Sequence, residues 1–147
     1  MTAQIVFALA CAVMLPACSG SRDADGASHS AAPGGKSSYH FVVIPKVVHP
    51  WFDKVNTGAK QAAADIEKLT GAKVDIQYSA PQKADVVEQN QILESAIATH
   101  PDGIAIDLLD AKANRAVLDE ALQQKIPVVV FDSVAPQGMH LTSVGSD

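Results

Sequence analysis

Short apolar runs alternate with helical patterns of apolar residues from about residue 39 onward. Five runs, each bounded by polar or turn residues, predict strands at 40–44, 73–78, 104–106, 128–131 and 141–144. Between the first four runs, apolar residues recur every three or four positions and predict helices at about 52–69, 85–99 and 111–124. This alternation indicates βαβ units with right-handed crossovers. The predicted fold class is therefore α/β, with a doubly wound parallel sheet.

Cap and turn residues mark where the predicted helices begin and end. Gly71 follows the first helix, at the position where a left-handed residue commonly ends a helix. Asp85 and Glu88 have the spacing of a capping pair at the start of the second helix. The first helix carries an apolar stripe that is expected to face inward, formed by Val55, Ala59, Ala62, Ile66 and Leu69.

The chain begins with an unbroken apolar run of 11 residues, at positions 5–15. This run is shorter than the roughly 20 residues that span a bilayer, but it fits the core of a signal peptide. Leu15-Pro16-Ala17-Cys18 follows directly and resembles the lipobox of bacterial lipoproteins. That resemblance implies that Cys18 becomes the lipidated N-terminus of the mature protein. The alternative is an ordinary secretory signal peptide in which Cys18 is incidental.

Residues 19–38 have the composition of a flexible tether. Ten of these 20 residues are Gly or Ser, and no apolar period runs through them. The predicted organisation is a signal peptide with a lipobox at 1–18, a tether at 19–38 and a folded lobe at 39–147.

Charge and motif content exclude several classes of function. The formal net charge is −5 and no run of Lys or Arg occurs, which argues against a nucleic-acid surface. Cys and His residues lack the spacing of a zinc site, and neither a metal nor a cofactor is expected. The segment between Pro45 and Trp51 contains no dinucleotide fingerprint and no phosphate loop. An enzyme of the Rossmann or flavodoxin type is therefore not expected.

The loop after the first predicted strand carries candidate ligand-binding residues. In open α/β sheets, ligands bind just beyond the carboxyl ends of the strands. Lys46 supplies a hydrogen-bond donor there, and His49 is expected to be a hydrogen-bond partner rather than a general base. Trp51, the only Trp of the chain, is expected at the mouth of the site. Phe52 fits the core of the first helix and a ligand contact equally well.

Three carboxylates follow predicted parallel strands. Asp107, Asp132 and Asp147 each lie just beyond a strand, so that they are expected to gather at the edge that also carries Trp51. Carboxylates that accept O–H groups, beside an aromatic face, suit a polyol ring. The alternative is that such residues cap the next helix, which is the expected role of Asp110 and stays open for Asp107. No helix follows Asp132 closely enough to be capped, which favours a ligand contact.

The segment from residue 39 to residue 147 resembles the type I periplasmic substrate-binding proteins of the ribose and galactose class. Pro50-Trp51-Phe52 is similar to that family's Asn-Pro-aromatic-aromatic loop, with His49 in place of Asn. Residues 101–104 are similar to its approach to the third strand, and residues 145–147 to its segment leading toward the hinge. Residues 126–132 are similar to its fourth strand, whose final Asp contacts sugar hydroxyls. Ser133 stands where the family often has Arg.

This resemblance implies the substrate-binding component of an ABC-type sugar importer. Such a protein binds a monosaccharide between two lobes, docks on a transporter permease and lies in the periplasm or cell envelope, here through a lipid anchor. Because the family has two lobes, the chain is expected to be an N-terminal part that binds sugar weakly by itself.

Two other binding functions are alternatives to sugar import. Ile44-Pro45-Lys46 is similar to a branch with rhamnose-type and autoinducer-2-type binders. A periplasmic ligand sensor that partners a chemoreceptor or sensor kinase therefore stays open. A repressor-type effector domain is less expected, because the first 38 residues carry no helix-turn-helix pattern.

Overall fold

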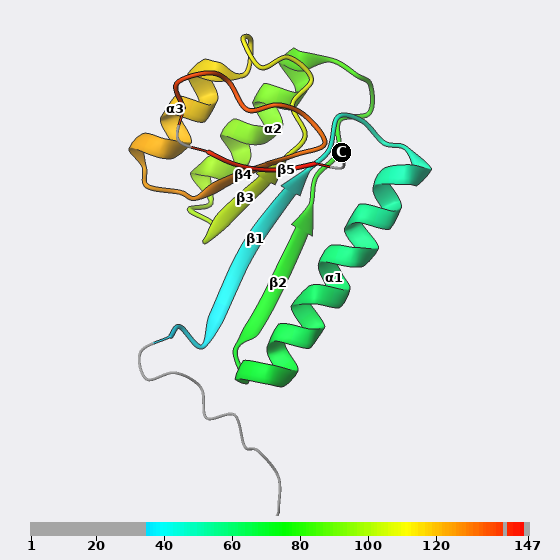
Figure 1. Cartoon of the computed structure of the whole chain (residues 1–147), viewed down its shortest axis with the longest axis vertical. Helices are drawn as coiled ribbons and strands as arrows, with labels where there is room; N and C mark the ends of the chain where they lie inside the picture. The colour runs from blue at the N-terminus through cyan, green and yellow to red at the C-terminus, as the bar shows by residue number, and fades with distance from the viewer. Residues whose placement is uncertain (1–34, 140, 146–147) are drawn as a thin grey trace, which may run out of the picture.

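A computed structural model describes residues 35–139 and 141–145 (Figure 1). Its strands form one five-stranded sheet in the order β2-β1-β3-β4-β5, and every neighbouring pair is parallel. The strands are β1 (Ser38–Ile44), β2 (Lys73–Tyr78), β3 (Gly103–Ile106), β4 (Val128–Phe131) and β5 (Thr142–Val144). The predicted fold class is confirmed.

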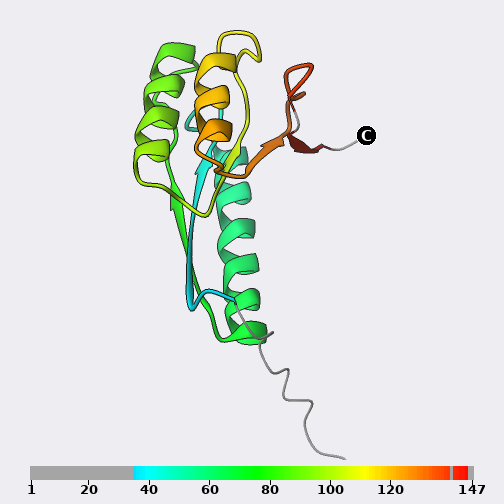
Figure 2. The same ribbon diagram turned by 90° about the vertical axis from the view of Figure 1, so that its left-hand side faces the viewer.

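Three helices connect the first four strands: α1 (Pro50–Thr70), α2 (Val86–Ala98) and α3 (Arg115–Gln123). The path from β1 to β2 runs in one direction along the sheet, and the paths to β3 and β4 run in the other. Right-handed crossovers therefore place α1 on one face of the sheet and both α2 and α3 on the opposite face. Figure 2 shows α2 and α3 side by side on their face.

The main hydrophobic core lies between the sheet and the α2–α3 layer. The central strands contribute side chains with no exposed surface, among them Ile44, Ile106 and Val130. Leu93 of α2 and Leu118 of α3 complete this layer and are equally buried. These helices bury their apolar stripes as the sequence pattern predicts.

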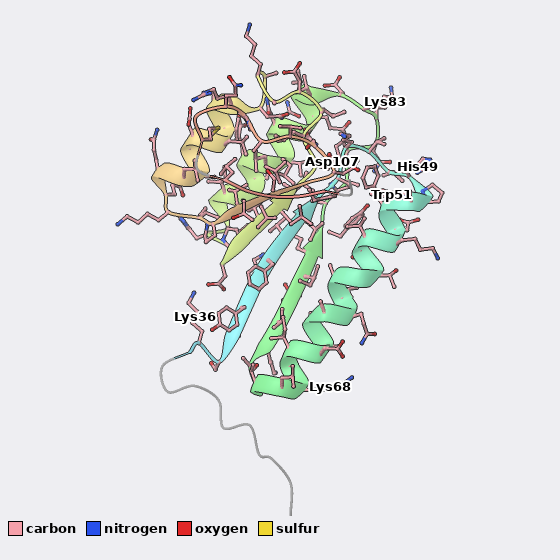
Figure 3. All side chains as sticks on the ribbon, in the orientation of Figure 1. Lys36, His49, Trp51, Lys68, Lys83 and Asp107 are labelled. Atoms are coloured by element: carbon pink, nitrogen blue, oxygen red, sulfur yellow. The ribbon has the colours of Figure 1, made fainter. Side chains whose placement is uncertain are left out.

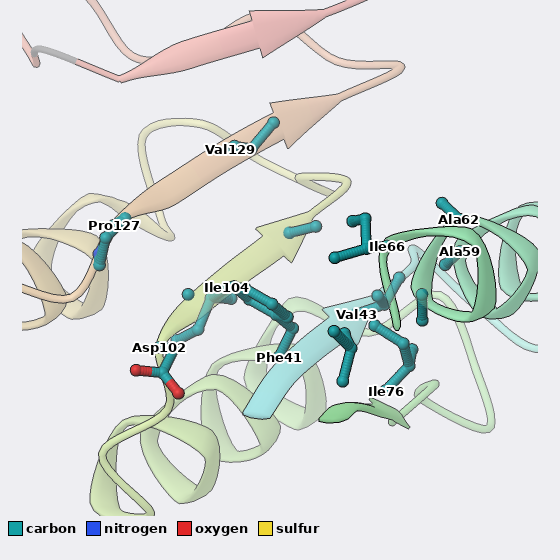
Figure 4. A pocket seen from close by; sticks show the side chains of 14 residues that line it. Phe41, Val43, Ala59, Ala62, Ile66, Ile76, Asp102, Ile104, Pro127 and Val129 are labelled. Atoms are coloured by element: carbon teal, nitrogen blue, oxygen red, sulfur yellow. The ribbon is translucent and has the colours of Figure 1, made fainter. Parts of the chain in front are cut away.

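The opposite face of the sheet is only partly covered. On α1, Phe52 and Ala63 are buried, whereas Ile66 and Leu69 of the predicted inward stripe are 45% and 61% exposed. An apolar groove of about 310 Å³ separates α1 from β3 and β4 (Figure 4). The expectation of a fully inward stripe was wrong at these positions because α1 packs mainly against β2, at the edge of the sheet.

Capping interactions explain the limits of α1 and α2. Gly71 has φ 74° after the end of α1, the left-handed conformation that glycine adopts without strain. The Asp85 carboxylate accepts hydrogen bonds from the backbone N–H groups of Val87 and Glu88, as predicted for a cap. Glu88 completes the motif differently from the predicted pair, since its carboxylate accepts from the N–H groups of residues 82 and 83.

The start of α3 differs from the sequence prediction. The helix begins at Arg115, and the four preceding residues form turns. Asp110 shapes these turns, because its Oδ1 atom accepts hydrogen bonds from the N–H groups of Lys112 and Ala113 at 2.9 and 2.8 Å. Asp110 therefore caps the turns that precede α3 and not the first turn of the helix itself.

Candidate functional site

The candidate site lies at the carboxyl ends of β1, β3 and β4. β1 has β2 on one side and β3 on the other, so that the chain changes direction along the sheet at β1. Open α/β sheets bind ligands in the crevice at such a switch point. Lys46 follows β1 after one intervening residue, whereas Asp107 and Asp132 follow β3 and β4 directly.

Lys46 pairs with both carboxylates. Its Nζ atom lies 2.9 Å from Asp107 Oδ1 and 3.5 Å from Asp132 Oδ2. The sequence predicted that these three side chains would share one edge of the sheet, and the structure brings them into contact. Asp147, the third predicted carboxylate, lies outside the described residues.

Asp107 sits at the bottom of this cluster with no exposed surface. Apart from the ion pair with Lys46, its carboxylate oxygens have no hydrogen-bond partner among the described residues. Burial raises the pKa of Asp107 above its ordinary value, although the Lys46 ammonium group opposes this shift. A carboxylate with this much unused acceptor capacity is uncommon in a protein interior.

Lys46 and Asp132 form the accessible part of the cluster, with 31% and 43% of their side chains exposed. Burial lowers the pKa of Lys46, but contacts with Asp107 and Asp132 outweigh this effect, so that the pKa lies above its ordinary value. Lys46 is therefore a stable ammonium group whose donors face two carboxylates and solvent.

The backbone of Asp132 adopts a rare conformation. Its φ is 56°, in the left-handed region that a non-glycine residue occupies at a cost. Its N–H group donates to the carbonyl of Val144 in β5 at 3.0 Å, which holds the residue at the sheet edge. Strain of this kind is concentrated at functional sites.

Three rings surround the start of α1. His49 is the N-cap, and its Nδ1 atom accepts the N–H group of Trp51 at 3.2 Å. Trp51 is 50% exposed and meets the ring of Phe52 edge-on, with 4.9 Å between centroids. Phe52 is 7% exposed, which favours the core among the two interpretations left open for it. Figure 3 shows His49 and Trp51 at the end of α1 nearest the candidate site.

Ser133 is part of the site that the sequence did not identify. Its Oγ atom accepts the N–H group of Leu108 at 2.8 Å, which joins the loops after β3 and β4. The only signal in the sequence was that Ser133 replaces an Arg common in the resembled family. The Ser133 hydroxyl therefore stabilises the loop after β3 through the backbone of Leu108 and does not point out into solvent.

No group of three His, Cys, Asp or Glu residues in 35–139 and 141–145 is arranged to hold a metal ion. Over the same residues, no helix is both long and apolar enough to cross a bilayer.

Residues 40–147 match the family described as "Periplasmic binding protein domain". The chain belongs to this family. A comparison with curated proteins found no match.

Solved sugar-binding proteins share the fold. GanP, a glucose-galactose binding protein from Geobacillus stearothermophilus, is 34% identical, with a TM-score of 0.67 over 76% of this chain and 38% of its own. An ABC transporter solute-binding protein from Burkholderia graminis C4D1M, in complex with D-arabinose, is 40% identical, with a TM-score of 0.59 over 67% of this chain and 32% of its own. The chain thus spans about a third of the length of these structures.

Proposed function

We propose that this chain supplies one wall of a monosaccharide site in the substrate-binding component of an ABC-type sugar importer. The observation that carries the proposal is the Lys46–Asp107–Asp132 cluster at the switch point of the sheet. The proposal includes a transporter permease as partner and a periplasmic or cell-envelope location, with a lipid anchor at Cys18.

The exposed part of the cluster suits a polyol. The Asp132 carboxylate is an acceptor for two neighbouring sugar hydroxyls, and the third N–H of the Lys46 ammonium is a donor for a hydroxyl or ring oxygen. Asp107 lies beneath Lys46 and orients it, so that a sugar contacts Asp107 only if Lys46 moves aside. The half-exposed ring of Trp51 offers a flat surface for the C–H face of the sugar.

The relatives support a monosaccharide as ligand. GanP is described as a glucose-galactose binding protein, and the Burkholderia protein was solved with D-arabinose. Both are at least a third identical to this chain over the parts that align. Hexoses and pentoses are therefore the first candidates.

One wall is not a complete pocket. A small-molecule site buries about 70–90% of its ligand, and the relatives are far longer than this chain. If a complete receptor binds at about 1 μM and each wall contributes half the free energy, one wall retains affinity near 1 mM. We therefore expect weak binding by residues 19–147 alone.

NMR titration of residues 19–147 with D-galactose, D-glucose, D-arabinose and D-ribose tests the proposal. We expect at least one sugar to shift the signals of Lys46, Trp51 and Asp132 with near-millimolar affinity. The sugar should be recovered unchanged, which separates a binding protein from an enzyme. Absence of shifts with all four sugars, or shifts confined to other parts of the fold, would overturn the assignment.

A further inference from the structure

A buried glutamine connects the two strands that carry the ion pair. Gln89 lies in the second turn of α2 and has no exposed surface. Its Nε2 atom donates to the carbonyl oxygens of Pro45 at 3.2 Å and Asp107 at 2.8 Å. Its Oε1 atom accepts the N–H group of Leu109 at 3.1 Å. The amide orientation is unambiguous, because the two carbonyls only accept and the N–H only donates.

These contacts extend the connection between β1 and β3 beyond the end of the sheet. The last backbone bond between the two segments runs from the N–H of Asp107 to the carbonyl of Ile44 at 2.9 Å. Pro45 follows, and no backbone hydrogen bond joins the two segments beyond this point in the described part of the chain. The side chain of Gln89 takes over at this point, with both of its donor hydrogens used.

The two carbonyls lie on the backbone next to the two members of the ion pair. One carbonyl is that of Asp107 itself, and the other immediately precedes Lys46 along the chain. One planar amide group therefore fixes the distance between the backbone segments from which both charged side chains project.

We propose that Gln89 is a positioning residue for the candidate sugar site, holding Lys46 against Asp107 through the backbone on both sides. The functional part of this inference rests on the proposed sugar-binding role. The geometric part concerns Lys46 and Asp107 alone and is testable without any ligand.

The adjacent residue provides a matched control. Asn90 donates through Nδ2 to the carbonyl of Ala113 at 3.2 Å and accepts from the Nδ2 atom of Asn114 at 2.7 Å. These contacts hold the turns before α3 and do not reach Lys46. Gln89→Met and Asn90→Leu each remove hydrogen bonds between α2 and other segments of the fold, so that both are expected to lower the denaturation midpoint. Only Gln89→Met should disturb the ion pair.

Titration of the Lys46 ammonium group by NMR, in the 147-residue chain without ligand, separates positioning from a general structural role. In the unsubstituted protein the pKa of Lys46 lies above its ordinary value because of Asp107 and Asp132. In Gln89→Met we expect this elevation to disappear, since Lys46 leaves both its buried surroundings and its partners. In Asn90→Leu it should persist. An unchanged Lys46 titration in Gln89→Met would overturn the proposal.

Gln89→Asn gives a second variant in case Gln89→Met does not fold. It keeps an amide in the interior but is one methylene too short to reach both carbonyls, so the same loss of elevation is expected. In titrations with D-galactose and D-arabinose, Gln89→Met should weaken binding about tenfold or more, and Asn90→Leu less than about twofold. Equal affinity of Gln89→Met and the unsubstituted protein contradicts positioning. If the unsubstituted protein binds none of the four sugars named above, the sugar role fails and the Lys46 titration alone decides the geometric part.

Discussion

Lys46 Nζ lies 2.9 Å from Asp107 Oδ1, with the carboxylate fully buried and the ammonium still partly open to solvent. The two partners therefore contribute unequally to stability. Removing the ammonium leaves a buried charge without a counter-ion, whereas removing the carboxylate charge leaves an ammonium that retains water and Asp132.

Asp107→Asn is expected to leave the free energy of unfolding unchanged or to raise it by up to about 1 kcal/mol at pH 7. The folded-state pKa of Asp107 is raised by burial, so the folded state binds this proton more readily than the unfolded state. Its contribution therefore makes stability fall as pH rises through the window between the ordinary and the raised value. Urea denaturation across that window should show this slope in the unsubstituted protein and a smaller one in the variant. A large loss of stability in Asp107→Asn would contradict the expectation.

Lys46→Met is expected to lower the free energy of unfolding by roughly 3 kcal/mol at neutral pH, because Asp107 becomes an unpaired buried charge. The loss should shrink as pH falls and Asp107 takes up a proton. The double variant Lys46→Met/Asp107→Asn should recover most of the stability. Additive losses in the double variant would show that the two side chains do not act as a pair.

Substitutions at Asp132 should separate backbone strain from ligand contact. Asp132→Gly relieves the left-handed strain and is expected to raise stability by about 0.5–1 kcal/mol. Asp132→Ala keeps the strain and should be less stable than the glycine variant. In a full-length homologue that carries this lobe, both should weaken sugar binding by roughly 2 kcal/mol through loss of a charged acceptor. Calorimetry in which Asp132→Gly binds sugar like the unsubstituted protein would remove Asp132 from the site.

Trp51→Ala is expected to weaken sugar binding by at least about 1 kcal/mol while changing stability little, because half of the indole is exposed. Trp51→Phe should retain part of the affinity, since it keeps a flat ring at the same place. As the chain has one Trp, its fluorescence reports directly on this position. Fluorescence that does not respond to a sugar whose binding is seen by NMR would place Trp51 outside the contact.

Cys18 is predicted to carry a lipid. Expression in a bacterium supplied with labelled palmitate should label the protein, and Cys18→Ser should abolish the label. In membrane fractionation, the unsubstituted protein should be found in the membrane fraction and the Cys18→Ser variant in the soluble fraction. A label that survives Cys18→Ser would contradict lipidation at Cys18, whereas an unsubstituted protein without label would support the ordinary secretory signal.

The sequence predicted the strands and the gathering of the charged residues because both depend on short-range patterns and on the common direction of parallel strands. Asp107 and Asp132 each end an apolar run, which was enough to place them at one edge. It did not predict the complete burial of Asp107 or the positive φ of Asp132, since both are set by neighbouring strands distant in the sequence.

The role of Gln89 could not be predicted from the sequence either. A glutamine at an inward position of a helix has no distinctive pattern, and its role depends on Pro45 and Asp107, which are 44 and 18 residues away. The late start of α3 has a local cause that the sequence did contain, in the form of Asp110 and the turns that it caps. The apolar period extends back to about residue 111, and for this reason the helix was predicted to start there and not at Arg115.

The uneven covering of the sheet has a consequence for how the protein opens. The residues of α1 lie outside the buried cluster that joins β1, β3, β4, α2 and α3. Local unfolding free energy follows buried apolar contacts, so backbone amides of α1 should exchange with deuterium sooner than those of β3. Trp51 lies on this more labile element, whereas Lys46 and Asp107 are attached to the protected strands. A ligand that bridges them would join the two parts and slow exchange along α1.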